Sequence, residues 1–404
     1  MPTPAPAPMP GPIPGPGQVV RSSSAELLAR LVTFDTTSRN SNLELIGWVR
    51  AYLDDHGVPY RESRSADGTR ANLHARIGPA VAGGIALSGH VDTVPVDGQR
   101  WTSDPFRVRV DGGRLYGRGT ADMKGFVACM LAAVPDLTAM TLARPVHLFV
   151  TFDEEVSMEG ARKLIATLDE PGWPRPGGVV VGEPTSMQPV VGHKGRLAAT
   201  VRVRGRAGHS AEPARGVNAI HAAARAIAWL ADATDARAAN GRFAPEYETP
   251  YTTSQVGTVA GGSILNIIPE ATEFGVEWRT IPGDDAPALF EAFQAHCRAA
   301  IEPAMKATDP RTGFEFEVRD WVPGLALSPD HALAAQVRRA ANSNGAGHVS
   351  YATEGGLYEG AGLPTIVCGP GSIAQAHAAD EFIEQAELDR CDAFIRRLVG
   401  ELVK

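Results

Sequence analysis

Three short, uninterrupted apolar runs limit most strongly what this chain can fold into. They span residues 85–88, 146–151 and 178–181. Such runs are typical of strands buried on both faces of a parallel sheet. Open α/β sheets bind ligands at the carboxyl ends of their strands. We therefore expect a binding crevice from the residues that follow the three runs, which are His90, Asp92, Asp153, Glu154, Glu155 and Glu183.

The rest of the chain alternates helical periodicity with short β-rich runs from Ser22 onward. This alternation indicates an α/β fold, with a mixed or mostly parallel sheet covered by helices. Helices are predicted at residues 25–32, 42–56 and 385–399, and a further strand at residues 366–368.

A different pattern occupies the middle of the chain. Its predicted order is strand, helix, two strands, helix and strand, which is the βαββαβ pattern of a split sandwich. The elements are expected at residues 197–206, 217–231, 252–259, 272–281, 286–301 and 314–321. We interpret residues 194–322 as an inserted lid and dimerisation domain, residues 19–193 and 323–404 as the catalytic domain, and the proline-rich residues 1–18 as a disordered tail.

Composition excludes several classes of protein. The net charge of −8 is scattered, and no basic stripe suggests a nucleic-acid partner. No apolar run approaches the ~20 residues needed to span a membrane. The start of the chain lacks the pattern of a secretory signal, so a cytoplasmic location is expected. The four cysteines are widely separated and form no CxxC pair, which favours buried thiols over disulfides or a zinc knuckle.

Histidine and carboxylate residues gather in five clusters, which we expect at successive strand ends. Taken singly, each residue is more commonly a helix cap or an ion-pair partner. Together, imidazole and carboxylate groups without thiolate suit zinc, cobalt or manganese. Adjacent Glu154 and Glu155 add weight, because paired carboxylates repel unless a cation lies beside them. The clusters are residues 89–92, 119–125, 153–155, 182–185 and 376–381, which hold enough ligands for two ions that share a carboxylate.

In order and spacing, these motifs resemble the di-zinc deacylase and exopeptidase family that includes carboxypeptidase G, aminoacylase and succinyl-diaminopimelate desuccinylase. The resemblance covers nearly all of residues 22–404. It implies two Zn²⁺ per subunit, with Co²⁺ or Mn²⁺ as possible substitutes. By the family pattern, one ion is bound by His90 and Glu183, the other by Glu155 and His377, and Asp122 bridges them.

The same resemblance assigns further roles. Asp92 is expected to orient His90 by accepting its second ring N–H, and Glu154 is expected to be the general base. His209 matches a lid histidine that reaches the active site of a partner subunit in a homodimer. Asn266 and Arg279 match positions that contact substrate, and Arg279 could bind a carboxylate with two hydrogen bonds.

Longer strings point to one branch of the family. Residues 117–125, 182–195 and 368–377 resemble enzymes that remove the acetyl group from N2-acetylornithine, a step of arginine biosynthesis. In place of the Ser-Asp-Gly-Arg segment of the desuccinylase, this chain has Glu354 within Thr-Glu-Gly-Gly. Glu354 is expected either to meet the substrate ammonium or to be a structural hydrogen-bonding residue. A broad N-acyl amino acid deacylase, a desuccinylase-like enzyme and a dipeptidase or carboxypeptidase remain alternatives.

Overall fold

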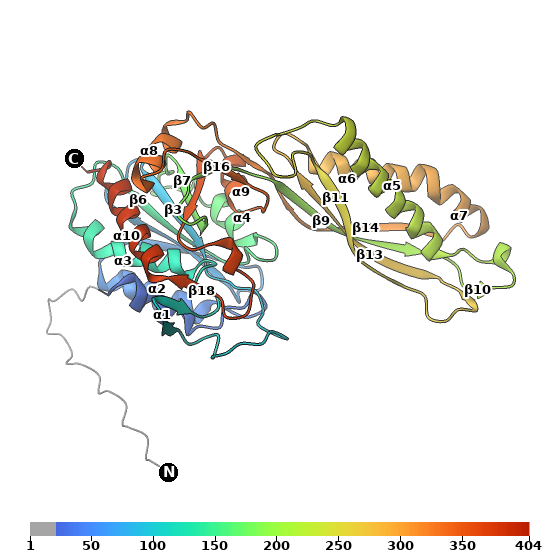
Figure 1. Ribbon diagram of the computed structural model, residues 1–404, viewed down its shortest axis with the longest axis horizontal. Helices are drawn as coiled ribbons and strands as arrows, with labels where there is room; N and C mark the ends of the chain where they lie inside the picture. Colours follow the sequence, from blue (N-terminus) through green and yellow to red (C-terminus); the bar gives the residue numbers. More distant parts are fainter. Residues whose placement is uncertain (1–21, 404) are drawn as a thin grey trace, which may run out of the picture.

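The computed structural model describes residues 22–403, so the predicted disordered tail lies outside the described residues. Figure 1 shows two bodies arranged along the longest axis. The larger body contains both ends of the described chain, and the smaller body is formed by the middle of the sequence. No helix within residues 22–403 has the length and apolar character that crossing a membrane requires.

A nine-stranded mixed sheet forms the centre of the larger body, in the order β1-β2-β6-β3-β7-β17-β8-β15 with β16 beside β8. Its central strands are parallel, since β3 pairs in parallel with β6 and β7, and β17 with β7. The predicted fold class and its three buried apolar strands are confirmed. The strands are β1 Tyr60–Arg64, β2 Ala71–Ile77, β3 Ile85–His90, β6 Val146–Thr151, β7 Val179–Pro184, β8 Val190–His193, β15 Leu325–Ala326, β16 Gly347–Val349 and β17 Thr365–Gly369.

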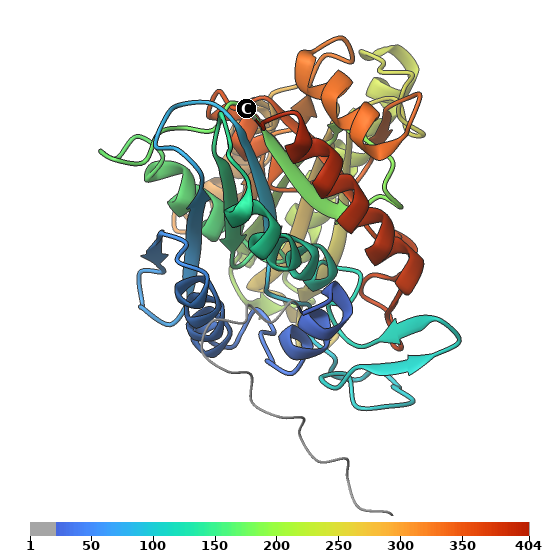
Figure 2. The same ribbon diagram turned by 90° about the vertical axis from the view of Figure 1, so that its left-hand side faces the viewer.

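Helices cover both faces of this sheet, because its central strands are apolar on both sides. One face packs against α1, α2, α3, α8 and α10 through a core that includes Leu28, Val127 and Phe394. The opposite face packs against α4 and α9 through Leu164 and Tyr358. Figure 2 shows α3 and α10 side by side in front of the sheet. The helices are α1 Ser24–Val32, α2 Leu43–Asp55, α3 Lys124–Ala139, α4 Glu159–Ala166, α8 Ala332–Ala341, α9 Gly355–Gly360 and α10 Gln385–Gly400.

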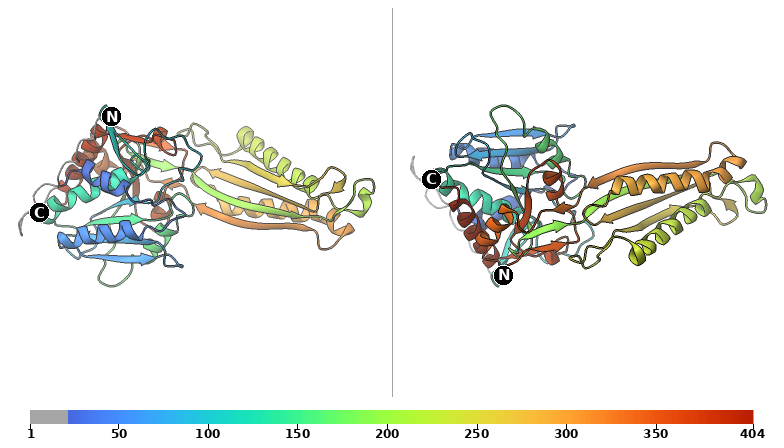
Figure 3. Two further views of the ribbon diagram at one scale, coloured as in Figure 1. Left: turned by 90° about the horizontal axis from the view of Figure 1, so that it is seen from below. Right: turned by 90° about the horizontal axis from the view of Figure 1, so that it is seen from above.

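The smaller body is a four-stranded antiparallel sheet in the order β11-β13-β9-β14. Helices α5, α6 and α7 cover one face, where Trp278, Phe290 and Phe293 pack, and Figure 3 shows them in front of the strands when seen from above. A two-stranded ladder, β10 with β12, lies at its far end. The elements are β9 Gly195–Arg204, β10 Gly208–His209, α5 Ala219–Asn240, β11 Thr253–Gly261, β12 Ile267–Ile268, β13 Ala271–Thr280, α6 Ala286–His296, α7 Glu302–Thr308 and β14 Gly313–Val322.

One predicted helix of this body is divided. The single helix expected at residues 286–301 ends at His296 as α6, and a π-helical turn at Cys297–Ile301 leads into α7. Pro303 lies in the first turn of α7. Because proline has no backbone N–H, it cannot donate the hydrogen bond that would continue α6.

Two glycines allow the two crossings between the bodies to lie against each other. The chain enters the smaller body between β8 and β9 at Gly195 and returns between β14 and β15 at Gly324. A Cβ atom on Gly324 would lie 2.9 Å from the carbonyl oxygen of His193, and one on Gly195 would lie 2.9 Å from the Gly324 nitrogen. Larger residues would therefore force the crossings apart.

Two buried histidines join strands β2 and β6 on the face that α4 covers. Arg61 Nε donates to His74 Nδ1 at 3.2 Å, and His74 Nε2 lies 2.8 Å from His147 Nδ1. Because arginine only donates, His74 must carry its proton on Nε2 and donate it to His147. Burial, helped by the charge of neighbouring groups, lowers the pKa of His74 to about 2 and that of His147 to about 4. Both imidazoles are therefore neutral at physiological pH.

This pair predicts a loss of stability on acidification. Between pH 6.5 and 4 the unfolded chain takes up protons on these histidines while the folded chain does not, so the free energy of unfolding falls as the pH falls. His147→Asn should reduce this slope by about 1 kcal/mol per pH unit. Urea unfolding at a series of pH values measures it. His331→Asn, which keeps a helix-capping residue, is the control. Equal slopes in the parent and His147→Asn would contradict the prediction.

Candidate metal centre

The candidate metal centre lies at the carboxyl edge of the central strands. β3 ends at His90, β7 carries Glu183, and the turn after β6 carries Glu154 and Glu155. These strands are adjacent and parallel, so their ends meet at one edge of the sheet. The fold thereby brings together ligand-type residues that lie far apart in the sequence.

Asp122 lies between the two histidines. Its Oδ1 is 3.0 Å from His90 Nε2, and its Oδ2 is 3.3 Å from His377 Nε2. His90 Nε2 is also 3.7 Å from Glu183 Oε1. On the other side, His377 Nε2 is 3.1 Å from Glu155 Oε2. A carboxylate with one oxygen toward each imidazole has the arrangement needed to bridge two ions.

The donor set fits divalent metal ions. Candidate ligand atoms of His90, Glu154 and Glu183 lie within 4.8 Å of one another, and so do those of His90, Asp122 and Glu155. Oε1 of Glu155 and Oε1 of Glu183 are buried without a hydrogen-bond partner. Buried oxygens normally have a partner, and a cation would supply one. Imidazole and carboxylate donors suit zinc, cobalt and manganese.

The electrostatics of the cluster point the same way. Burial, reinforced by the charge of Asp122, raises the pKa of Glu183 well above its ordinary value and that of Glu155 to about 7. Burial and the charge of Glu183 also raise the pKa of Glu154 well above its ordinary value. Hydrogen bonds to Asp122 and Glu155 raise the pKa of His377 to about 10. Protons held by these crowded groups would be displaced when divalent ions bind.

Comparison with known proteins identifies the family. The profile of peptidase family M20/M25/M40 matches residues 86–401. This chain belongs to that family. Acetylornithine deacetylase of Yersinia pestis is 36% identical over 377 residues, which cover 91% of this chain and 92% of that protein.

Solved structures of M20 proteins share the fold. A metallo-carboxypeptidase of the family from Sulfolobus solfataricus superposes with a TM-score of 0.74 at 16% identity, covering 94% of this chain and 98% of that one. A dinuclear metal-binding peptidase of the family from Bacillus subtilis has a TM-score of 0.61 at 16% identity, covering 94% of this chain and 98% of that one. The family and the fold class predicted from the motifs are thus confirmed.

Asp92 contacts the turn that carries Glu154 and Glu155, here called the glutamate turn, more directly than it contacts His90. Its Oδ1 accepts from the backbone N–H of Glu154 at 3.0 Å, and its Oδ2 accepts from that of Glu155 at 3.3 Å. His90 Nδ1 lies 3.0 Å from the backbone carbonyl of Asp92 and 3.5 Å from its carboxylate. The second ring N–H of His90 therefore donates to the backbone carbonyl of Asp92, which is nearer than its carboxylate. Either partner leaves Nε2 facing Asp122.

A second support for this turn was not predicted. Asp153 adopts a left-handed backbone conformation, with φ of 59°. Arg70 Nη1 lies 2.7 and 2.6 Å from the two carboxylate oxygens of Asp153. The backbone oxygen of Asp153 accepts from the N–H groups of Ser157 and Met158. Arg70 lies in no predicted element, so only the tertiary contact reveals its role.

Glu381 holds the loop that carries Asp122. Its Oε1 accepts from the backbone N–H groups of Ala121 and Asp122 at 2.9 and 3.1 Å. Its Oε2 accepts from the N–H of Gly119 at 3.0 Å and from Arg118 Nη1 at 2.8 Å. Glu381 and Arg118 are both buried. Glu381 belongs to the predicted cluster at residues 376–381, but the sequence does not show that its carboxylate binds the loop at residues 118–122.

The three predicted lid residues lie in two places. His209 is exposed on β10, at the far end of the smaller body, and the backbone oxygen of Asn266 accepts from the N–H of Ser210 at 3.1 Å beside it. Arg279 lies near the end of β13 that adjoins the larger body and forms an ion pair with Glu277 at 3.0 Å. Within one chain, His209 and Asn266 do not reach the metal centre.

Glu354 lies buried beside Ser88 and Tyr358. Its side chain is buried, and Oε2 lies 3.3 Å from Ser88 Oγ and 3.4 Å from the hydroxyl of Tyr358. Burial raises its pKa to about 7. Oε2 is thus a structural hydrogen-bonding group, whereas Oε1 is buried without a hydrogen-bond partner.

The geometry predicts that metal removal destabilises the protein without unfolding it. Chelator-treated protein should keep its circular dichroism spectrum, because apolar cores on both faces of the sheet hold the fold. Adding Zn²⁺ at about a hundred times its dissociation constant should stabilise the protein by about 2.7 kcal/mol for each ion bound and raise the unfolding temperature. Mg²⁺, which prefers a full set of oxygen ligands, is the control ion. An unfolding temperature that is unchanged by zinc, cobalt and manganese would contradict the assignment.

Proposed function

We propose that this chain is a two-metal amide hydrolase that removes the acetyl group from N2-acetylornithine, giving ornithine and acetate. The observation that carries the proposal is the position of Asp122 between His90 and His377, with one carboxylate oxygen toward each ring. Similarity to acetylornithine deacetylases over most of the chain supports the choice of substrate. This reaction belongs to arginine biosynthesis.

In this proposal the ions are zinc. His90 and Glu183 would hold one ion, Glu155 and His377 the other, and Asp122 would bind both. Divalent ions in such a site supply Lewis acidity to the scissile carbonyl and lower the pKa of water toward ~7. Hydrogen bonds to Asp92 and Glu381 hold the glutamate turn and the Asp122 loop in position.

Glu154 is the proposed general base. Asp92 fixes its backbone, and burial beside Glu183 favours its protonated form. Divalent ions beside it would favour the ionised form, and a carboxylate can take a proton from the attacking water and then deliver it to the leaving nitrogen. Ligand-type atoms of Glu154 also lie close to those of His90 and Glu183, so a role as metal ligand is the competing assignment.

Substrate recognition is proposed to involve Arg279 and, across the dimer together with His209, Asn266. Arg279 would bind the α-carboxylate with two hydrogen bonds, and it lies at the end of the smaller body nearest the metal centre. Oε2 of Glu354 is held by Ser88, so only its buried Oε1, which has no hydrogen-bond partner, could meet the side-chain ammonium of ornithine. This observation makes a broad N-acyl amino acid deacylase the second candidate function.

Comparing two substrates tests the choice. N2-acetylornithine should have a kcat/KM about tenfold or more above that of N-acetylnorvaline, which lacks only the terminal amino group. Arg279→Lys should raise KM for both substrates, since an ammonium cannot bind a carboxylate in bidentate fashion. Arg202→Lys, on the neighbouring strand and paired with Glu273, is the control.

Three results would redirect the assignment. Equal values for the two substrates would favour the broad deacylase. Faster cleavage of N-succinyl-diaminopimelate or of dipeptides than of either acetylated amino acid would favour the remaining alternatives.

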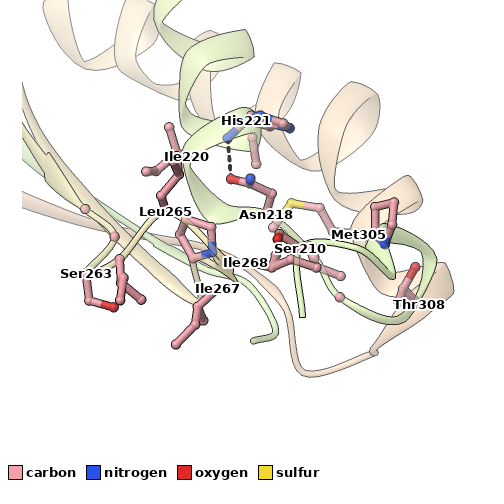
Figure 4. A pocket seen from close by; sticks show the side chains of 18 of the residues that line it. Ser210, Asn218, Ile220, His221, Ser263, Leu265, Ile267, Ile268, Met305 and Thr308 are labelled. Carbon is pink, nitrogen blue, oxygen red and sulfur yellow. Dashed lines mark hydrogen bonds between the residues drawn. The ribbon is translucent and has the colours of Figure 1, made fainter. Parts of the chain in front are cut away.

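We also propose that residues 194–322 form a lid and dimerisation domain, and residues 19–193 and 323–404 the catalytic domain of a homodimer. Exposed apolar side chains gather at the far end of the smaller body, where Leu265 is 98% and Val259 62% exposed. A hollow of about 880 Å³ opens beside them (Figure 4), with Ile268 and Met305 in its lining. A second copy would cover this surface and receive His209 in its own metal centre.

Mixing two inactive variants tests the assignment of Glu154 as general base and that of His209 as a residue that acts across subunits. Glu154→Gln should keep its metal and lose about 10²–10⁴ in turnover. His209→Ala should also keep its metal and lose turnover, because His209 is proposed to donate a hydrogen bond to the oxyanion that forms when water attacks the amide carbonyl. After subunit exchange, each mixed dimer should contain one intact site, so activity returns. Loss of metal from Glu154→Gln would make Glu154 a ligand. Verified exchange without recovered activity would show that His209 does not act across subunits.

A further inference from the structure

His377 is the least enclosed of the five proposed ligands. Its side chain is 54% exposed, whereas those of Asp122 and Glu155 are 7% exposed. It also lies in a loop rather than at a strand end and has a left-handed backbone, with φ of 62°. Such a conformation persists only where surrounding contacts impose it. Contacts to the backbone of His377 are therefore decisive for where its ring points.

Gln99 makes such a contact. Its side-chain Nε2 donates to the backbone oxygen of His377 at 2.8 Å. The opposite atom, Oε1, accepts from Arg118 Nη2 at 2.6 Å and from Trp101 Nε1 at 3.1 Å. Arginine and tryptophan side chains only donate, so this amide can be oriented in one way alone. Nε2 must then face His377.

Arg118 extends the contact to the bridging ligand. The same guanidinium that donates to Gln99 also donates to Glu381 at 2.8 Å. Glu381 in turn accepts from the backbone N–H of Asp122 at 3.1 Å. An unbroken series of hydrogen bonds thus runs from the His377 loop through Gln99, Arg118 and Glu381 to the Asp122 loop.

We propose that Gln99 is a positioning residue for His377, and that the Gln99–Arg118–Glu381 series sets the spacing between His377 and Asp122. This inference rests on the proposed two-metal function. We expect the effect to be larger at the position that His377 binds, because the side-chain hydrogen bonds of Gln99 go to His377, Arg118 and Trp101, whereas His90 and Glu183 are carried by strands β3 and β7. Partners that orient a metal ligand typically change affinity by about 10–100-fold when removed.

Zinc titration of metal-free protein against a chromophoric chelator tests the proposal. Gln99→Glu keeps an acceptor for Arg118 but loses the donor to His377, and Gln99→Met loses both. We expect both variants to bind one Zn²⁺ as the parent does and the second about tenfold or more weakly. Gln336→Glu, the same change on α8 away from the site, should bind both ions as the parent does. The absorption spectrum of Co²⁺-loaded protein gives an independent view of the second position.

The possible outcomes separate this inference from the function on which it rests. If the parent binds two ions and both Gln99 variants bind them with parental affinities, the positioning role is overturned while the two-metal site stands. Equal weakening at both positions would indicate a general structural role and also overturn it. A parent that binds fewer than two ions would remove the two-metal proposal itself. Circular dichroism of each metal-free variant verifies that it is folded.

Discussion

Mutual repulsion among Asp122, Glu154, Glu155 and Glu183 is the constraint on which the rest of the structure depends. Strands β3, β6 and β7 end at one edge, and their parallel pairing brings these groups together around His90 and His377. Like charges this close are tolerated only when protons or cations lie among them. The chain belongs to the M20 family, and two imidazoles lie beside the carboxylates. Bound divalent ions would therefore offset the repulsion among the carboxylates.

Backbone N–H groups and arginines keep the crowded carboxylates in place. Asp92 takes the N–H groups of the glutamate turn, and Glu381 takes those of the Asp122 loop, so two acidic residues act as acceptors for loops that carry other acidic residues. Arg70 forms an ion pair with Asp153 of the same turn, and Arg118 forms one with Glu381. Asp153 and His377 have left-handed backbone conformations. Such conformations are typical of functional sites, where surrounding contacts hold them in place.

Much of this architecture could be predicted from sequence, because buried parallel strands leave uninterrupted apolar runs and helices leave a period. β6 has the predicted bounds, and the six middle elements appear in the predicted order. The helix expected at residues 286–301 is divided because Pro303 interrupts its hydrogen bonds. Burial of Glu354 and the contacts of Gln99 depend on tertiary packing, which leaves no local pattern.

The central claim is that two ions share Asp122 while Glu154 binds neither. Anomalous diffraction from zinc-loaded crystals, measured on both sides of the zinc absorption edge, tests it most directly. Two peaks should flank Asp122, one next to His90 and Glu183 and the other next to Glu155 and His377, with the oxygens of Glu154 beyond the ~2.0–2.2 Å of a zinc–carboxylate bond. A single peak, or Glu154 at bonding distance from either peak, would contradict the account.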